Sequence, residues 1–151
     1  MNARRWIVAI AVVVAASCAA TAQDAPRILT TRPDAVAWRT PPGAADGRER
    51  AVIHGDPDAG AGFWTYRIRT TAPIRVEAHT HPVDEYITVL EGDWSLGEGA
   101  RFDESRLKTY PAGSFVHIPA GAPHFVATGA GVTVIQSSGA GPFRTEFIPP
   151  R

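Results

Sequence analysis

The chain has 151 residues, a length typical of one domain, and 44% of them are hydrophobic, which excludes a wholly disordered chain. Lys and Arg together number 15, as do Asp and Glu, so the net charge is zero. This balance disfavours a protein that binds nucleic acid through its phosphates. The single cysteine, Cys18, excludes an internal disulfide and a cysteine-rich zinc site.

Residues 1–22 have the organisation of a secretory signal peptide. Two arginines in the first five residues precede an uncharged run over Trp6–Ala16, and Ala20–Ala22 offers small residues for cleavage. The run is shorter than the ~20 residues that cross a bilayer, so we expect no stable membrane span. We expect a periplasmic or secreted protein cleaved near Ala22. The alternative is a lipoprotein anchored through Cys18.

The remainder is predicted to be an extended N-terminal arm over 23–62 and a β domain over 63–149. Asp24–Arg50 is rich in Pro, Ala, Gly and Arg and has little periodicity, so we expect at most one short strand there. From Phe63 onward, short apolar segments alternate with Gly/Pro turns. The expected strands are Phe63–Thr70, Ile74–Ala78, Tyr86–Leu90, Asp93–Leu96, Phe115–Ile118, His124–Thr128, Val132–Gln136 and Phe143–Ile148. This spacing predicts an all-β sandwich or barrel.

Two histidine-containing segments carry the candidate chemistry. His79 and His81 are two residues apart, so they share a face of an extended chain, and Glu85 has the same parity. Two imidazoles and a carboxylate suit a divalent metal and leave coordination positions open for water or substrate. His124 follows the turn at Pro119–Gly121 and is a candidate fourth ligand.

These two segments resemble the motifs of the cupin superfamily. The first motif, G-x5-H-x-H-x3/4-E-x6-G, is matched from His79 to Gly92, and the second, G-x5-P-x-G-x2-H-x3-N, from Gly113 to His124. The chain departs from the family at two positions that are not ligands, with Pro73 for the opening glycine and Thr128 for the closing asparagine.

The resemblance implies a double-stranded β-helix (jelly-roll) barrel with a metal inside. Carried over by position, the implied ligands are His79, His81, Glu85 and His124. The chain is also similar to small exported single-domain bacterial cupins, which share His-x-His-Pro-x-x-Glu, Pro-Ala-Gly-x-x-His-Phe and a terminal Gly-Pro-Phe. The corresponding residues are 79–85, 119–125 and 141–143.

Five further residues are candidates for contact with substrate on the cavity wall. They are Tyr66, Trp94, Phe115, His117 and Gln136. For His117 we favour a structural imidazole over a proton shuttle. Aromatic residues in a small barrel are more often core than ligand contacts, so we expect only one or two of them to touch substrate.

Two classes of function remain open. A site of three histidines and one carboxylate suits Fe, Mn, Ni, Co or Zn without choosing among them. The resemblance implies a dioxygenase, isomerase or lyase that acts on a small oxygen-bearing molecule, with Glu85 as the candidate catalytic base. The alternative is a non-catalytic periplasmic module that binds a metal or a small molecule. The arm and the exposed strand edges predict a homodimer.

Overall fold

A computed structural model describes residues 27–42, 44 and 46–149, so the predicted signal peptide and Cys18 lie outside the described residues. The chain divides into two units after Thr30, and the strands described belong to the second unit, Thr31–Arg151. Within the described part of the chain, no helix combines the length and the hydropathy needed to cross a bilayer.

The second unit consists of short strands and two single-turn 3₁₀ helices. The strands are β1 (Glu49–His54), β2 (Phe63–Thr70), β3 (Arg75–Thr80), β4 (Glu85–Glu91), β5 (Asp93–Glu98), β6 (Lys108–Pro111), β7 (Phe115–Ile118), β8 (His124–Thr128), β9 (Thr133–Ala140) and β10 (Glu146–Phe147). The 3₁₀ helices are η1 (Pro33–Ala35) and η2 (Glu104–Arg106). The all-β prediction is confirmed.

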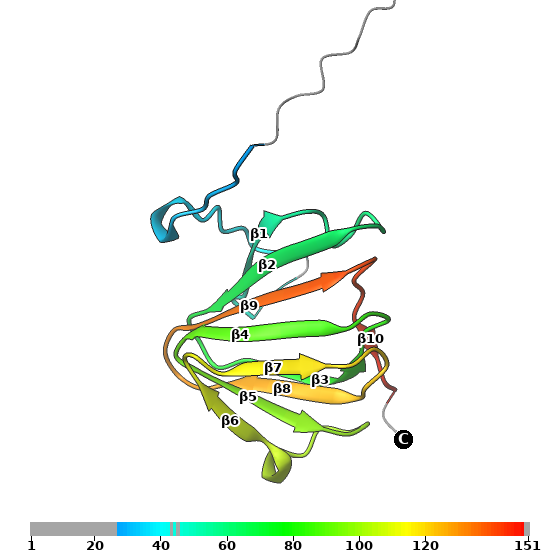
Figure 1. Cartoon of the computed structure of the whole chain (residues 1–151). Helices are drawn as coiled ribbons and strands as arrows, with labels where there is room; N and C mark the ends of the chain where they lie inside the picture. Colours follow the sequence, from blue (N-terminus) through cyan, green and yellow to red (C-terminus); the bar gives the residue numbers. More distant parts are fainter. Residues whose placement is uncertain (1–26, 43, 45, 150–151) are drawn as a thin grey trace, which may run out of the picture. The chain divides into compact units, whose positions relative to one another are not determined.

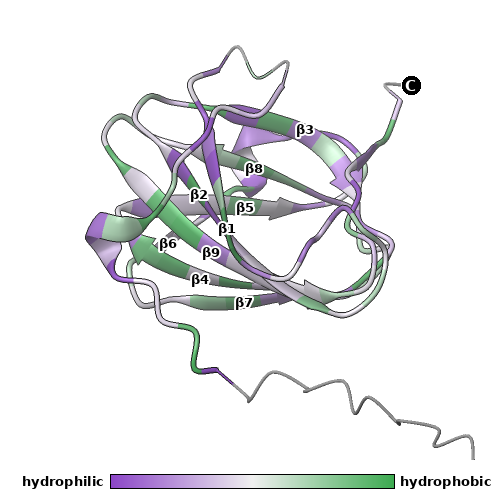
Figure 2. Cartoon of the chain, turned by 90° about the horizontal axis from the view of Figure 1, so that it is seen from above, coloured by the Kyte–Doolittle hydropathy of each residue, from purple (hydrophilic) through white to green (hydrophobic). Residues whose placement is uncertain are grey.

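The strands form two antiparallel five-stranded sheets that face each other (Figure 1). One sheet has the order β1-β2-β9-β4-β7 and the other β10-β3-β8-β5-β6. In the view from above, β3 and β8 lie on one side and β4 and β7 on the other (Figure 2). Apart from β1–β2 and β5–β6, neighbours in each sheet are not consecutive in sequence, so the chain passes repeatedly between the sheets, as the predicted double-stranded β-helix requires.

Alternation along each strand sorts its side chains between the interior and the surface. In β4, Glu85, Ile87 and Val89 are buried, whereas Tyr86 and Leu90 are exposed. Apolar side chains of both sheets meet in one core, which contains Ile87, Val89, Trp94, Leu96, Ile118 and Ile135. Burying one such aliphatic side chain contributes about 1.5–3 kcal/mol to stability.

The observed strands differ from the expected ones mainly at the ends of the chain and at the sheet edges. Strands β2, β7 and β8 have the expected limits. Edge strand β6 was not expected, because Lys108–Pro111 has no apolar alternation and pairs with β5 alone. The expected strand Phe143–Ile148 is reduced to Glu146–Phe147, because Phe143 leaves the sheet to pack against Trp64 and other aromatic rings.

The N-terminal segment contributes a strand to the first sheet. β1 lies within the predicted arm and pairs antiparallel with β2. Its backbone is fixed further by a bridge in which Arg39 and Arg50 exchange both of their backbone hydrogen bonds, at 2.8 and 3.0 Å. The segment that precedes β1 therefore lies against the sheet at Arg39.

One glycine in β5 permits a close approach between strands. A methyl group at Gly97 would overlap the ring of Phe125, its partner across the β5–β8 pair. We predict that Gly97→Ala lowers the free energy of unfolding by about 1–3 kcal/mol. Gly129→Ala, between β8 and β9 with open space around it, is the control and changes stability by less than about 1 kcal/mol. Urea unfolding measures both, and an unchanged midpoint for Gly97→Ala contradicts this packing.

Candidate metal centre

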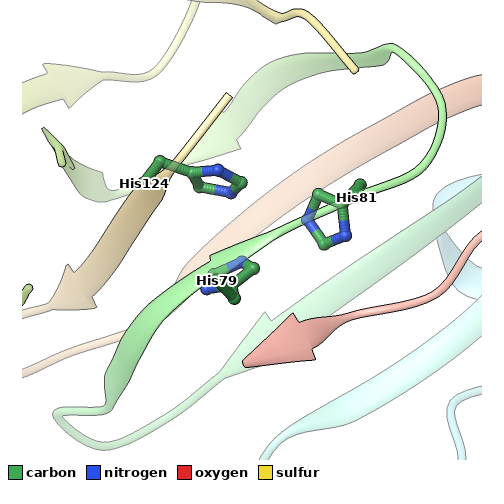
Figure 3. A group of neighbouring side chains, drawn as sticks. All are labelled: His79, His81 and His124. Atoms are coloured by element: carbon green, nitrogen blue, oxygen red, sulfur yellow. The ribbon is translucent and has the colours of Figure 1, made fainter. Parts of the chain in front are cut away.

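Three buried histidines from two neighbouring strands form a compact cluster. His79 lies in β3 directly opposite His124 in β8, and His81 follows the end of β3. Their nearest ring nitrogens all lie within 4.8 Å of one another. Figure 3 shows the three rings turned into the same space. The strand pairing therefore places two residues 45 positions apart, together with His81, at one point.

Each of the three imidazoles is oriented by a hydrogen bond from its Nδ1 to a backbone carbonyl. The acceptor oxygens belong to Glu77 for His79 (2.7 Å), Arg144 for His81 (2.7 Å) and Ala122 for His124 (3.0 Å). Because a carbonyl oxygen can only accept, each Nδ1 carries the proton and donates it. Each Nε2 then keeps a free lone pair, as in metal-binding histidines generally.

Burial keeps these imidazoles neutral. Removal from water is the main cause that lowers the pKa of each ring, and it brings the pKa of His124 to about 4. The neutral imidazole is the form that binds a metal, because a protonated Nε2 has no lone pair. At neutral pH the three rings are therefore ready to act as ligands.

Glu85, at the start of β4, lies beside the three histidines. Its Oε1 accepts hydrogen bonds from the Ser137 hydroxyl at 2.6 Å and from the Tyr66 hydroxyl at 3.1 Å. Its Oε2 lies 3.4 Å from Nε2 of His81 but does not belong to the cluster within 4.8 Å. Burial raises the pKa of Glu85, and it also raises the pKa of Tyr66, which stays protonated as a donor.

This set of donors fits a divalent transition metal. Three imidazole nitrogens converge from one side, and a buried carboxylate with one oriented oxygen stands next to them. Such nitrogen-rich sites suit Zn, Fe, Co, Ni and Mn and leave further coordination positions open. A bound cation would also offset the cost of holding the Glu85 carboxylate away from water.

A cavity of about 230 Å³ opens beside the histidines, and two of the five predicted wall residues line it. Tyr66 and Trp94 line it together with aliphatic side chains of both sheets. The cavity is large enough for a small organic molecule. Besides the histidines and Glu85, its polar lining residues are Arg48, Tyr66 and four threonines, Thr70, Thr128, Thr133 and Thr145.

The other three predicted wall residues do not line this cavity. Phe115 and His117 occupy alternate positions of β7 that face outward, and Phe115 is 64% exposed. The inward positions of β7 hold Val116 and Ile118 instead. Gln136 accepts a hydrogen bond from Arg67 at 3.1 Å at the outer side of β9. The alternation of side chains along β7 and β9 therefore places these three residues outside the metal cavity, contrary to the expectation that they line it.

His117 has the structural setting that we favoured. Its Nε2 lies 3.2 Å from Oδ2 of Asp84, and its ring stacks on Tyr86 at 4.7 Å between centroids. Hydrogen bonding to Asp84 also holds the backbone of Ala120 at 2.8 Å, so this outer group fixes the turn before His124.

The cavity wall includes residues that the sequence did not single out. Phe143 stacks on the ring of His81 at 4.3 Å between centroids, and Phe147 lies near His79. Arg48 lines the cavity from the segment before β1. The terminal Gly-Pro-Phe of the resembling cupins was the available signal for Phe143. No pattern in the sequence points to Arg48.

The fold is similar to that of several solved structures. The polyketide cyclase RemF from Streptomyces resistomycificus matches with a TM-score of 0.67, 18% identity, and 83% of this chain and 88% of that chain covered. KdgF from a Halomonas species matches with a TM-score of 0.57, 15% identity and coverage of 75% and 94%. An RmlC-like cupin from Ralstonia eutropha matches with a TM-score of 0.60, 13% identity and coverage of 79% and 74%.

No family model matches the chain, and no curated protein sequence matches it significantly. The two facing sheets and the structural likenesses nevertheless show the fold of the cupin superfamily, the double-stranded β-helix. The predicted fold is confirmed.

The low pKa of His124 makes the stability of the metal-free protein depend on pH. In the unfolded chain this imidazole takes up a proton near its ordinary pKa of 6.5. In the folded chain its pKa is about 4, so it takes up the proton only at lower pH. We therefore predict that the free energy of unfolding falls as the pH is lowered from 6.5 to 4.5. Urea unfolding after removal of metal by a chelator measures this slope.

The variant His124→Asn tests the assignment of this slope. It removes one titrating ring, so its stability should fall less steeply over the same pH range. Glu85, whose pKa is raised, contributes a slope of opposite sign that is present in both proteins. Equal slopes for the two proteins would show that His124 is not the group responsible.

Proposed function

We propose that this chain is a metal-dependent enzyme that acts on a small oxygen-bearing molecule. The observation that carries the proposal is the convergence of three buried, neutral imidazoles with free Nε2 lone pairs in a cavity. A structural metal site would be closed by protein ligands, whereas this cluster faces a space large enough for a substrate. An open centre of this kind is compatible with dioxygenase, isomerase and lyase reactions.

His79, His81 and His124 would hold the metal, which when bound supplies Lewis-acid stabilisation of negative charge on a substrate oxygen. Glu85 is the candidate base or fourth ligand. Ser137 and Tyr66 hold its Oε1, so Oε2 is left to face the cavity beside His81. A carboxylate whose pKa burial has raised accepts a proton more readily than an exposed one.

The structural comparisons support an enzyme in general terms. RemF, one of the similar structures, is a polyketide cyclase, so this fold can house a catalyst that acts on a small molecule. At 18% identity, the likeness extends to the fold, and the reaction of this chain is proposed from its own residues.

Metal content tests the proposal most directly. We predict about one equivalent of Fe, Mn, Ni, Co or Zn per chain after purification without chelators or a metal-affinity column. His124→Ala should lose this metal, because two of three imidazoles do not retain it, and the β-rich circular dichroism spectrum should persist. His54→Ala, which removes an exposed histidine outside the cluster and outside both cavities, is the matched control and should keep full occupancy. Full metal occupancy in His124→Ala would contradict the proposed metal centre.

The reaction type is separated by oxygen uptake with enol and diketone substrates. Consumption of oxygen supports a dioxygenase, and turnover without it supports an isomerase or lyase. Glu85→Gln should keep the metal and lose turnover by about 100-fold or more if Glu85 is the base. A protein that binds one metal tightly and turns over none of these compounds would favour the non-catalytic binding module.

We also propose that the protein is exported and forms a homodimer. The signal-like residues 1–22 support export, and the edge strand β7, which carries the exposed Phe115, supports self-association. The intact mass of the periplasmic protein should correspond to cleavage near Ala22, whereas a lipid mass on Cys18 would support the lipoprotein instead. Light scattering at micromolar concentration should give twice the chain mass, and a monomer would contradict the dimer.

A further inference from the structure

We propose that a second cavity next to the metal centre is a carboxylate-binding subsite, formed by Arg50 and Arg48, that holds the acidic end of the substrate. This inference deepens the proposed function and rests on it for the identity of the reacting end. It assigns the substrate class as small carboxylic acids that carry a further oxygen group. Three observations support it, namely the position of the cavity, the unpaired edge of Arg50 and the placement of Arg48.

The second cavity has a volume of about 360 Å³ and adjoins the metal cavity. The two share one wall, which is made of Arg48, Tyr66, Ile68, Phe143 and Thr145. The segment before β1 closes the second cavity with Pro41, Pro42 and Ala44. A molecule in the second cavity therefore lies next to the cavity of the histidines.

Tyr66 connects the two sites. Its hydroxyl donates to Glu85 at the metal centre, and the guanidinium of Arg50 lies 4.6 Å from the centre of its ring. The distance from Arg50 to the metal centre is thus spanned by one tyrosine side chain. A substrate that reaches from the histidines to Arg50 needs only a short spacer between its two functional groups.

Arg50 presents an unpaired edge of its guanidinium. Its Nη1 contacts Oδ2 of Asp58 at 3.4 Å, but its Nε and Nη2 are buried and have no hydrogen-bond partner among the described residues. These two donors form one edge of the planar group, the geometry that matches the two oxygens of a carboxylate. Buried donors without a partner cost folding free energy, and a bound carboxylate would remove that cost.

Arg48 brings a second positive charge to the same wall. It lies two residues before Arg50 on an extended segment, so the two side chains share a face. Arg48 lines both cavities, so its charge lies next to the metal cavity as well as the second cavity.

The acidic side chains around this cavity are already engaged. Nη2 and Nε of Arg69 lie 2.6 and 2.8 Å from Oε2 of Glu49. Oδ2 of Asp46 lies 2.8 Å from Nε of Arg48. Asp58, which reaches Nη1 of Arg50, is 69% exposed and contributes a weak contact. None of these contacts uses the Nε–Nη2 edge of Arg50, so that edge remains for a ligand.

The test compares levulinate, a small oxo acid, with its neutral methyl ester by isothermal titration calorimetry. Both are titrated into the purified chain in its zinc-loaded and metal-free forms. We expect levulinate to bind both forms and to bind more tightly than the ester. Arg50→Gln should weaken levulinate binding by about 10- to 100-fold and leave ester binding unchanged, because it removes a charge-assisted pair of hydrogen bonds.

Matched variants define the contribution of each arginine. Arg48→Gln should also weaken levulinate binding, and Arg50→Lys should give an intermediate affinity because it keeps the charge and loses the two-donor edge. Arg101→Gln removes an exposed arginine that lines neither cavity and should change nothing. Circular dichroism and thermal unfolding identify any variant that does not fold.

The outcomes separate the subsite from the metal centre. Equal affinities of the folded wild-type chain for levulinate and its ester would overturn the subsite without any variant. Unchanged binding in both Arg50→Gln and Arg48→Gln would overturn it as well and assign Arg50 to packing on Tyr66 alone. Levulinate binding that requires zinc and ignores both arginines overturns the subsite but leaves the proposed metal centre intact. Arginine-dependent binding to a chain that takes up none of Fe, Mn, Ni, Co and Zn supports the subsite and refutes the metal centre.

Discussion

The hydrogen bonds from the three histidine rings to backbone carbonyls are the constraint on which the site depends. A barrel interior excludes water, so each polar ring placed there needs a partner inside the protein. The carbonyls of Glu77, Ala122 and Arg144 supply that partner through Nδ1, and this leaves Nε2 of each ring for a metal. Ser137 and Tyr66 do the same for one oxygen of Glu85. The same hydrogen bonds therefore satisfy the buried polar groups and orient them toward the metal site.

The segments before β1 and between β9 and β10 complete the site. Arg144, near the C-terminus, orients His81 through its carbonyl, and Phe143 stacks on the same ring. The segment before β1 closes the neighbouring cavity and brings Arg48 to the shared wall. The sheets alone would hold the histidines, but the terminal segments determine the shape and charge of the space in front of them. Differences in such segments would change substrate choice while the metal ligands stay the same.

Much of the fold could be predicted, because alternation and turn residues are local signals. Strands such as Phe63–Thr70 and His124–Thr128 were placed correctly. Of the predicted set His79, His81, Glu85 and His124, the three histidines form one compact cluster and Glu85 lies beside His81. The wall of the cavity was less predictable. Phe115 and His117 face outward because the phase of β7 follows from its pairing with β4, which composition does not reveal.

The sequence by itself determined the strand class, the resemblance to cupins and the identity of the candidate ligands, since these depend on residue type and short spacing. The tertiary structure alone decided three other features. It aligned His79 with His124 across the β3–β8 pair, separated Glu85 from the compact three-histidine group, and placed Arg48 and Arg50 beside Tyr66. Each of these depends on contacts between residues distant in the chain, and the pairing of strands and the packing of terminal segments fix such contacts only when the whole barrel has formed.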